Sequence, residues 1–202
     1  MKKMKYLSVI GCMIAAVSFT SCSEDDNNGT TPLNKEEIAT CFKAVKGNYT
    51  GKLIYEAKNE KNPKDKLDTL DVKWSIATDS TLSIASFPSK LLANCISDAT
   101  LKKALASAAN QDIKCRIKFN KISPVRFLIN PTPLEYALNY GGKDHKVKVT
   151  FYTNSTLSYG SQDMKKNTLQ LQLVEGSFTV DGKETAKNTS AVPFVFISTK
   201  KE

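Results

Sequence analysis

Most of the chain alternates between apolar and polar residues with a period of two, which predicts β-strands. The alternation is strictest at 146–151 and 168–173, where Val, Leu or Phe occupies every second position. One apolar and one polar face on the same strand indicate an antiparallel sheet with one side in water. We expect strands at 49–55, 72–76, 82–84, 113–122, 125–129, 134–140, 147–152, 169–174, 177–180 and 192–198.

Two segments have a helical period instead. Asn34 is a good N-cap, and Glu37 follows three residues later as its capping-box partner. Apolar residues then recur at helical spacing until Gly47, which predicts a short N-terminal helix. Residues 89–109 have the same spacing, with a second cap at Asp98, so we expect two short helices there.

The connections between the expected strands fit hairpins. Gly141–Asp144 and Asp181–Gly182 supply residues that tolerate the positive φ angles of tight turns. The predicted fold class is therefore α+β and mainly β. Its antiparallel sheet closes as a barrel or packs as a sandwich, with an N-terminal helix and a helical insertion near 89–109. Residues 33–202 are expected to form a single domain, since about 170 residues bury roughly 70% of the unfolded chain's surface.

The N-terminus has the order of an export signal. Lys2, Lys3 and Lys5 precede the apolar run 6–19, which is followed by small residues. That run is shorter than the roughly 20 apolar residues of a membrane span. We therefore interpret residues 1–21 as a cleavable signal peptide.

The residues at the end of this signal predict a lipid anchor. Phe19–Cys22 resembles the lipobox of bacterial lipoproteins, in which the cysteine is acylated and becomes the new N-terminus. This resemblance implies lipidation of Cys22, with attachment to a membrane through the acyl chains. Residues 22–32 carry no large apolar side chain apart from the anchor, so we expect a flexible tether. Its acidic cluster Glu24–Asp26 resembles the surface-export signal of Bacteroidetes lipoproteins, which favours the outer membrane and the cell surface; the periplasmic face is the alternative.

Charge narrows the range of partners. The formal net charge is +9, and three of these charges are the lysines of the leader. The remaining excess is spread along the chain without an arginine-rich block, which disfavours nucleic-acid binding. Attraction to an acidic glycan remains open, as does a lysine-rich face that is simply solvated.

Three cysteines remain in the domain: Cys41, Cys95 and Cys115. In an oxidising envelope Cys95 and Cys115 could form a disulfide, while the alternative is three buried thiols. Together with His145 the cysteines would suffice in number for a zinc site, but there is no Cys-x-x-Cys pair. We expect no metal and no cofactor.

Catalytic signals are weak. A hydrolase would have to use His145, the single histidine, which lies beside an expected hairpin tip. The pattern does not indicate a catalytic pair of carboxylates either. We therefore favour a non-enzymatic protein, with a hydrolase that uses His145 as an alternative.

Two kinds of surface site are expected instead. Tyr152 and Tyr159 are candidate ligand contacts, because exposed tyrosine rings can stack on sugars. The tripeptides that start at Asp68 and Asp79 resemble the O-glycosylation acceptor of Bacteroidetes. Thr69 and Ser80 are therefore candidate modification sites.

The mature chain as a whole resembles a known family. Gly47–Leu53 (GNYTGKL) looks like the opening of lipocalin-like or calycin-like lipoproteins of Bacteroidetes. With Val72–Ile76 and Ser86–Pro88, the chain is similar to one of their envelope lipoprotein families, known only as a domain of unknown function. The anchor, the tether and the lack of a catalytic constellation favour a membrane-anchored module that binds a ligand, such as a glycan, or an outer-membrane protein. A structural subunit of an outer-membrane complex is the alternative. The family supplies no catalytic residues.

Overall fold

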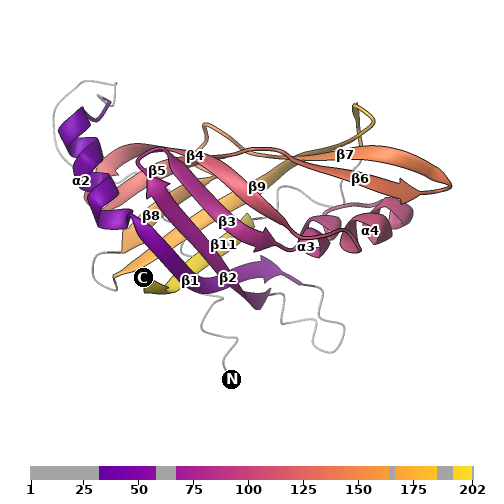
Figure 1. Ribbon diagram of the computed structural model, residues 1–202, viewed down its shortest axis with the longest axis horizontal. Coiled ribbons are helices and arrows are strands. Elements are labelled where there is room, and N and C mark those ends of the chain that lie inside the picture. Colours follow the sequence, from indigo (N-terminus) through magenta and orange to yellow (C-terminus); the bar gives the residue numbers. More distant parts are fainter. Residues whose placement is uncertain (1–31, 58–66, 164–166, 186–192, 202) are drawn as a thin grey trace.

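The computed structural model describes residues 32–57, 67–163, 167–185 and 193–201 (Figure 1). It begins with helix α2 (Lys35–Val45), whose N-terminus has the predicted capping box. The Asn34 side chain accepts hydrogen bonds from the backbone N–H groups of Glu36 and Glu37, and the Glu37 carboxylate accepts one from the Asn34 N–H. These contacts satisfy donors that a helix N-terminus otherwise leaves open. No helix among the described residues has the length and apolarity that crossing a membrane requires.

The sheet is a closed antiparallel barrel, which decides between the two predicted architectures. Within the described residues its eight strands are β1 (Gly47–Glu56), β2 (Leu67–Thr78), β3 (Thr81–Phe87), β4 (Gln111–Ile122), β5 (Val125–Pro131), β8 (Tyr159–Asp163), β9 (Thr168–Val180) and β11 (Pro193–Lys201). They are arranged in the order β11-β1-β2-β3-β4-β5-β8-β9. Pairing of β11 with β9 as well as with β1 closes the ring.

Side chains fill the interior of the barrel. Trp74 stacks on Tyr49 with ring centroids 5.6 Å apart and meets Phe196 edge-on at 6.1 Å. Phe127 packs edge-on against Phe119 at 5.4 Å. Inward residues from five strands are 0% exposed, so they border no space that a water molecule could enter: Leu53, Ile84, Phe127, Leu171 and Phe196. An eight-stranded barrel is just wide enough for side chains to fill it in this way.

A smaller side sheet extends from one end of the barrel. The second half of β9 continues past the barrel and pairs with β7 (Lys143–Phe151), which pairs with β6 (Leu134–Tyr140). The short β10 (Lys183–Glu184) lies on the other edge of β9. Leu134, Tyr136 and Leu138 alternate with exposed residues and are buried on one face of this sheet.

The predicted helical insertion covers the side sheet. As expected, it consists of two short helices, α3 (Ser89–Ala93) and α4 (Ala99–Ala106), and Asp98 caps the second by accepting from the Leu101 N–H at 2.7 Å. Helix α4 lies against β6 and α3 packs against α4, at the opposite end of the barrel from α2 (Figure 1). The insertion between β3 and β4 thus packs against the hairpin inserted between β5 and β8.

The structure corrects two strand predictions. We expected separate strands at 169–174 and 177–180, but β9 is continuous, and it pairs with Phe151 of β7 at Glu175, which is fully buried. Strand β8 was not among the predicted strands, so Tyr159 was expected to lie between strands. The inward position of β8 is Gly160, where a Cβ atom would overlap the Phe127 ring, so the strand has no apolar alternation.

Candidate functional site

The strongest candidate site is a group of three side chains on the outer wall of the barrel, which we call the tyrosine patch: Tyr152, Leu157 and Tyr159. The Tyr152 N–H donates to the Val174 carbonyl at 2.9 Å, and Tyr159 is the cross-strand partner of Gln172. Both tyrosines therefore flank β9 two residues apart, about 7 Å along the strand. Pairing with β9 therefore places the two tyrosines that the sequence indicated as candidate ligand contacts near each other.

Two of the three large apolar side chains that are exposed among the described residues belong to the patch. Tyr152 is 41% exposed and Leu157 is 43% exposed. Tyr159 is partly buried, with the Arg126 guanidinium carbon 5.8 Å from the centre of its ring. Burial raises the pKa of Tyr159, and the Arg126 charge opposes that rise. Arg126 Nε is buried and makes no hydrogen bond, and the guanidinium lies over the face of the tyrosine ring.

The loop that carries the patch is held in place by side-chain hydrogen bonds. Asn130 Oδ1 accepts from the Asn154 N–H at 2.6 Å, and Asn130 Nδ2 donates to Asn154 Oδ1 at 3.1 Å. Gln172 Nε2 donates to the Leu157 carbonyl at 2.9 Å. Ser158 is 0% exposed, and its hydroxyl accepts from the Val174 N–H at 3.3 Å. The patch is thus preorganised, which lowers the entropic cost of binding.

The patch suits a sugar ring better than a reacting group. Tyrosine presents an apolar ring face together with a hydroxyl, which matches the apolar faces and hydroxyl groups of a sugar. The Asn130 and Asn154 amides lie beside it as hydrogen-bonding groups. The sequence did not identify Leu157, Arg126 or Asn130 as members of this site, since only the barrel register brings them there.

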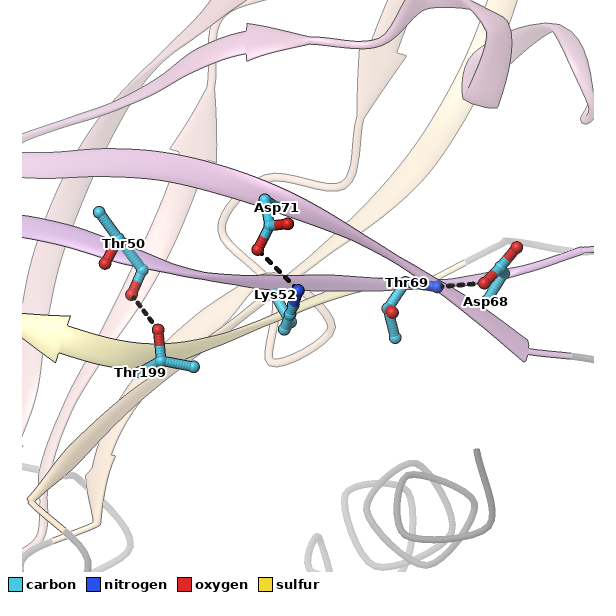
Figure 2. A network of polar contacts seen from close by, with 6 residues as sticks. All are labelled: Thr50, Lys52, Asp68, Thr69, Asp71 and Thr199. Carbon is cyan, nitrogen blue, oxygen red and sulfur yellow. Dashed lines mark hydrogen bonds and ion pairs between the residues drawn. The ribbon is translucent and has the colours of Figure 1, made fainter. Parts of the chain in front are cut away.

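A second part of the outer wall, over β1, β2 and β11, carries a polar network (Figure 2). Lys52 Nζ and Asp71 Oδ1 form an ion pair at 2.7 Å, and Thr199 Oγ1 donates to the Thr50 carbonyl at 3.2 Å. Beside these contacts, Ile54 and its cross-strand partner Val195 point away from the interior yet are 0% exposed. On this part of the outer wall, Leu67 and Ile197 pack against the two buried side chains.

The two candidate modification sites differ in their surroundings. Thr69 is partly buried on β2 opposite Ile54, and its N–H donates to Asp68 Oδ1 at 2.8 Å (Figure 2). Ser80 is exposed in the turn between β2 and β3, where its N–H donates to Thr78 Oγ1 at 3.3 Å. Modification of both remains a prediction, and Ser80 is the more accessible of the two.

His145 lies at the end of the side sheet. Its Nδ1 is 2.8 Å from Asp181 Oδ2, and its ring stacks on Tyr140 with centroids 4.2 Å apart. The hydrogen bond with His145 lowers the pKa of Asp181, while burial and the charges of Asp181 and Asp98 raise that of Tyr140. In the described part of the chain, no hydroxyl or thiol hydrogen-bonds to the His145 ring. The pair links the β6–β7 hairpin to the Asp181 turn and lacks the nucleophile that a triad needs.

The three cysteines of the domain are buried and form no disulfide bond in the described part of the chain. Cys95 lies just after α3 with its Sγ 3.9 Å from the Leu91 carbonyl oxygen, and Cys115 lies inside the barrel on β4. Burial raises the pKa of the Cys115 thiol. The Cys95–Cys115 disulfide that the sequence left open is not formed in the structure, and each thiol acts as a small apolar side chain in its own part of the core.

The remaining sequence predictions concern a metal site and the N-terminal segment. Among the described residues, no three His, Cys, Asp or Glu side chains cluster closely enough to hold a metal ion. Cys22, the signal peptide at 1–21 and the tether as far as residue 31 lie outside the described residues. Their predicted roles therefore remain predictions.

The fold and site together define a closed antiparallel barrel with a helix-covered side sheet and a preorganised aromatic patch on its outer wall. The domain of unknown function DUF4840 matches residues 44–180, from the end of α2 to the end of β9, and the chain belongs to this family. Neither the curated proteins nor the solved structures gave a match.

Proposed function

We propose that this protein is a lipid-anchored, non-enzymatic binding module of the bacterial cell envelope that holds a glycan against the outside of its barrel. One observation carries the proposal: the barrel interior is filled, whereas Tyr152 and Leu157 of the tyrosine patch are exposed on a preorganised loop. A ligand is therefore expected on the wall and not inside the ring.

The anchor is the other half of the proposal. Lipid on Cys22, after removal of residues 1–21, would attach the protein to the outer membrane. Residues 22–32 would then serve as a tether that carries the barrel away from the lipid surface. We favour the cell surface, where extracellular glycans are accessible, over the periplasmic face.

Replacing the patch tests the binding proposal. On an array of neutral and acidic glycans, Tyr152→Ala and Leu157→Ala are each expected to weaken binding by about tenfold. Tenfold corresponds to about 1.4 kcal/mol, a common loss when a central apolar contact is truncated.

Ile122→Ala is the matched control, because Ile122 is a similarly exposed apolar residue at 38% but lies at the end of β4, with β5 between it and Tyr159 on β8. It should leave binding unchanged. Equal losses in all three variants, or no glycan bound by the unaltered protein, would overturn the proposal.

A further inference from the structure

A row of positive side chains follows β4 along the outer wall of the barrel. Lys114, Arg116 and Lys118 are all exposed and alternate with buried inward residues. Since side chains repeat every two residues on one face of a strand, neighbouring members are about 7 Å apart along the strand. We call these three residues the cationic row.

The neighbours of the cationic row on adjacent strands are uncharged. Lys114 pairs with Ser83 on β3, and Arg116 lies between Thr81 on β3 and Asn130 on β5. Lys118 pairs with Leu128 on β5. Within the described residues none of the three forms an ion pair. Their charge is therefore available to a ligand.

Two acidic groups of this region, Asp71 and Asp112, have other contacts. Asp71, on the outer face of β2, pairs with Lys52 at 2.7 Å. At the start of β4, Asp112 Oδ1 accepts a hydrogen bond from the Ser86 N–H at 2.8 Å. Neither carboxylate lies opposite a member of the cationic row in the strand register.

The cationic row borders the tyrosine patch. Lys118 pairs with Leu128, and Leu128 pairs with Tyr159, so these three residues form one line across β4, β5 and β8. Asn130, the partner of Arg116, also holds the loop of the patch through Asn154. A ligand on the patch could therefore reach the cationic row without leaving the outer face of three adjacent strands.

We infer that the ligand is an acidic polysaccharide whose carboxylate or sulfate groups lie along the cationic row while one sugar ring contacts the tyrosine patch. The inference rests on the proposed function and specifies its ligand class. A linear series of charges at nearly regular spacing complements a linear polyanion, and the adjacent aromatic ring favours a sugar polymer over a lipid surface.

The test measures binding of purified protein to four probes: polygalacturonate, heparin, neutral dextran, and phosphatidylglycerol vesicles. The variant is Lys114→Gln/Arg116→Gln/Lys118→Gln. The control, Lys90→Gln/Lys103→Gln/Lys143→Gln, removes the same charge from exposed positions on α3, α4 and the side-sheet hairpin. Cationic-row contacts are exposed, so binding should weaken as salt rises from about 0.05 to about 0.5 M.

We expect both acidic polysaccharides to bind, and the cationic-row variant to lose at least tenfold in affinity while the control loses less than threefold. Equal losses in variant and control, or binding to vesicles alone, would overturn the inference. Binding of neutral dextran that depends on Tyr152 but not on the cationic row would reject the acidic ligand and leave the proposed function intact. No binding to any glycan would reject both.

Discussion

Gly160→Ala is expected to lower the free energy of unfolding by about 3 kcal/mol. The new methyl group would overlap the ring of Phe127, which is fully buried on β5 at the pairing partner of Gly160. Overpacking of a rigid core typically costs about 1–3 kcal/mol, and a barrel closed by hydrogen bonds has little freedom to yield. Urea unfolding of the purified protein measures the effect. The slope of the unfolding free energy against urea concentration is compared between variant and unaltered protein, because a changed slope would reveal a loss of two-state behaviour.

Two further variants test the cause of that loss. Ser161→Ala changes the next residue of β8, which points outward opposite Arg126, and should stay within about 0.5 kcal/mol of the unaltered protein. Phe127→Ala/Gly160→Ala should be less destabilised than the sum of the two single variants, because truncating the ring makes room for the methyl group. Strict additivity of the two single effects would show that β8 does not lie against Phe127.

Cys22→Ala is expected to move the protein from the membrane fraction to the soluble fraction almost completely. Two or more acyl chains anchor a protein stably, since each buried CH₂ contributes about 0.8 kcal/mol, and Cys22 is the acylation site of the proposed anchor. Fractionation of cells followed by detection of the protein measures the change.

Cys12→Ala is the matched control, because Cys12 lies within the segment expected to be removed and should not affect anchoring. Protease added to whole cells should degrade the unaltered protein if it is on the cell surface. A Cys22→Ala protein that stayed in the membrane fraction would contradict the lipid anchor, and protection from the protease would favour the periplasmic face.

The sequence correctly predicted the helices and strands in which the local residue pattern favours the same conformation as the tertiary packing. The capping box of Asn34 and the Asp98 cap are complete within a few residues, so they could be identified without knowledge of the fold. Strand β7 was also predicted, because its buried residues Val147, Val149 and Phe151 are large, apolar and two positions apart. In such elements local preference and tertiary packing favour the same conformation.

The errors come from positions where tertiary packing overrides the local pattern. Gly160 faces the interior only because Phe127 fills the adjacent space, which no pattern around β8 indicates. Glu175 interrupts the apolar alternation of β9, yet it is fully buried where the barrel meets the side sheet. A buried carboxylate is rare enough that sequence patterns assign it to a turn.

The candidate site was predictable in part. Tyr152 and Tyr159 were identified one by one as exposed aromatics, but their proximity depends on where each pairs with β9. The cationic row is visible as alternate residues of one strand, whereas the absence of facing carboxylates depends on the register with β3 and β5. Long-range strand pairing is the information that the sequence pattern lacks.

The central claim is that a filled barrel binds its ligand with its outer wall, and Trp74 reports on it directly. Trp74 is the single tryptophan of the chain and is 3% exposed in the barrel interior. The measurement is acrylamide quenching of its fluorescence, with and without saturating polygalacturonate. We predict weak quenching in both states, because neither quencher nor ligand enters the barrel. Strong quenching of the free protein that the ligand abolishes would contradict the claim and locate the ligand inside the ring.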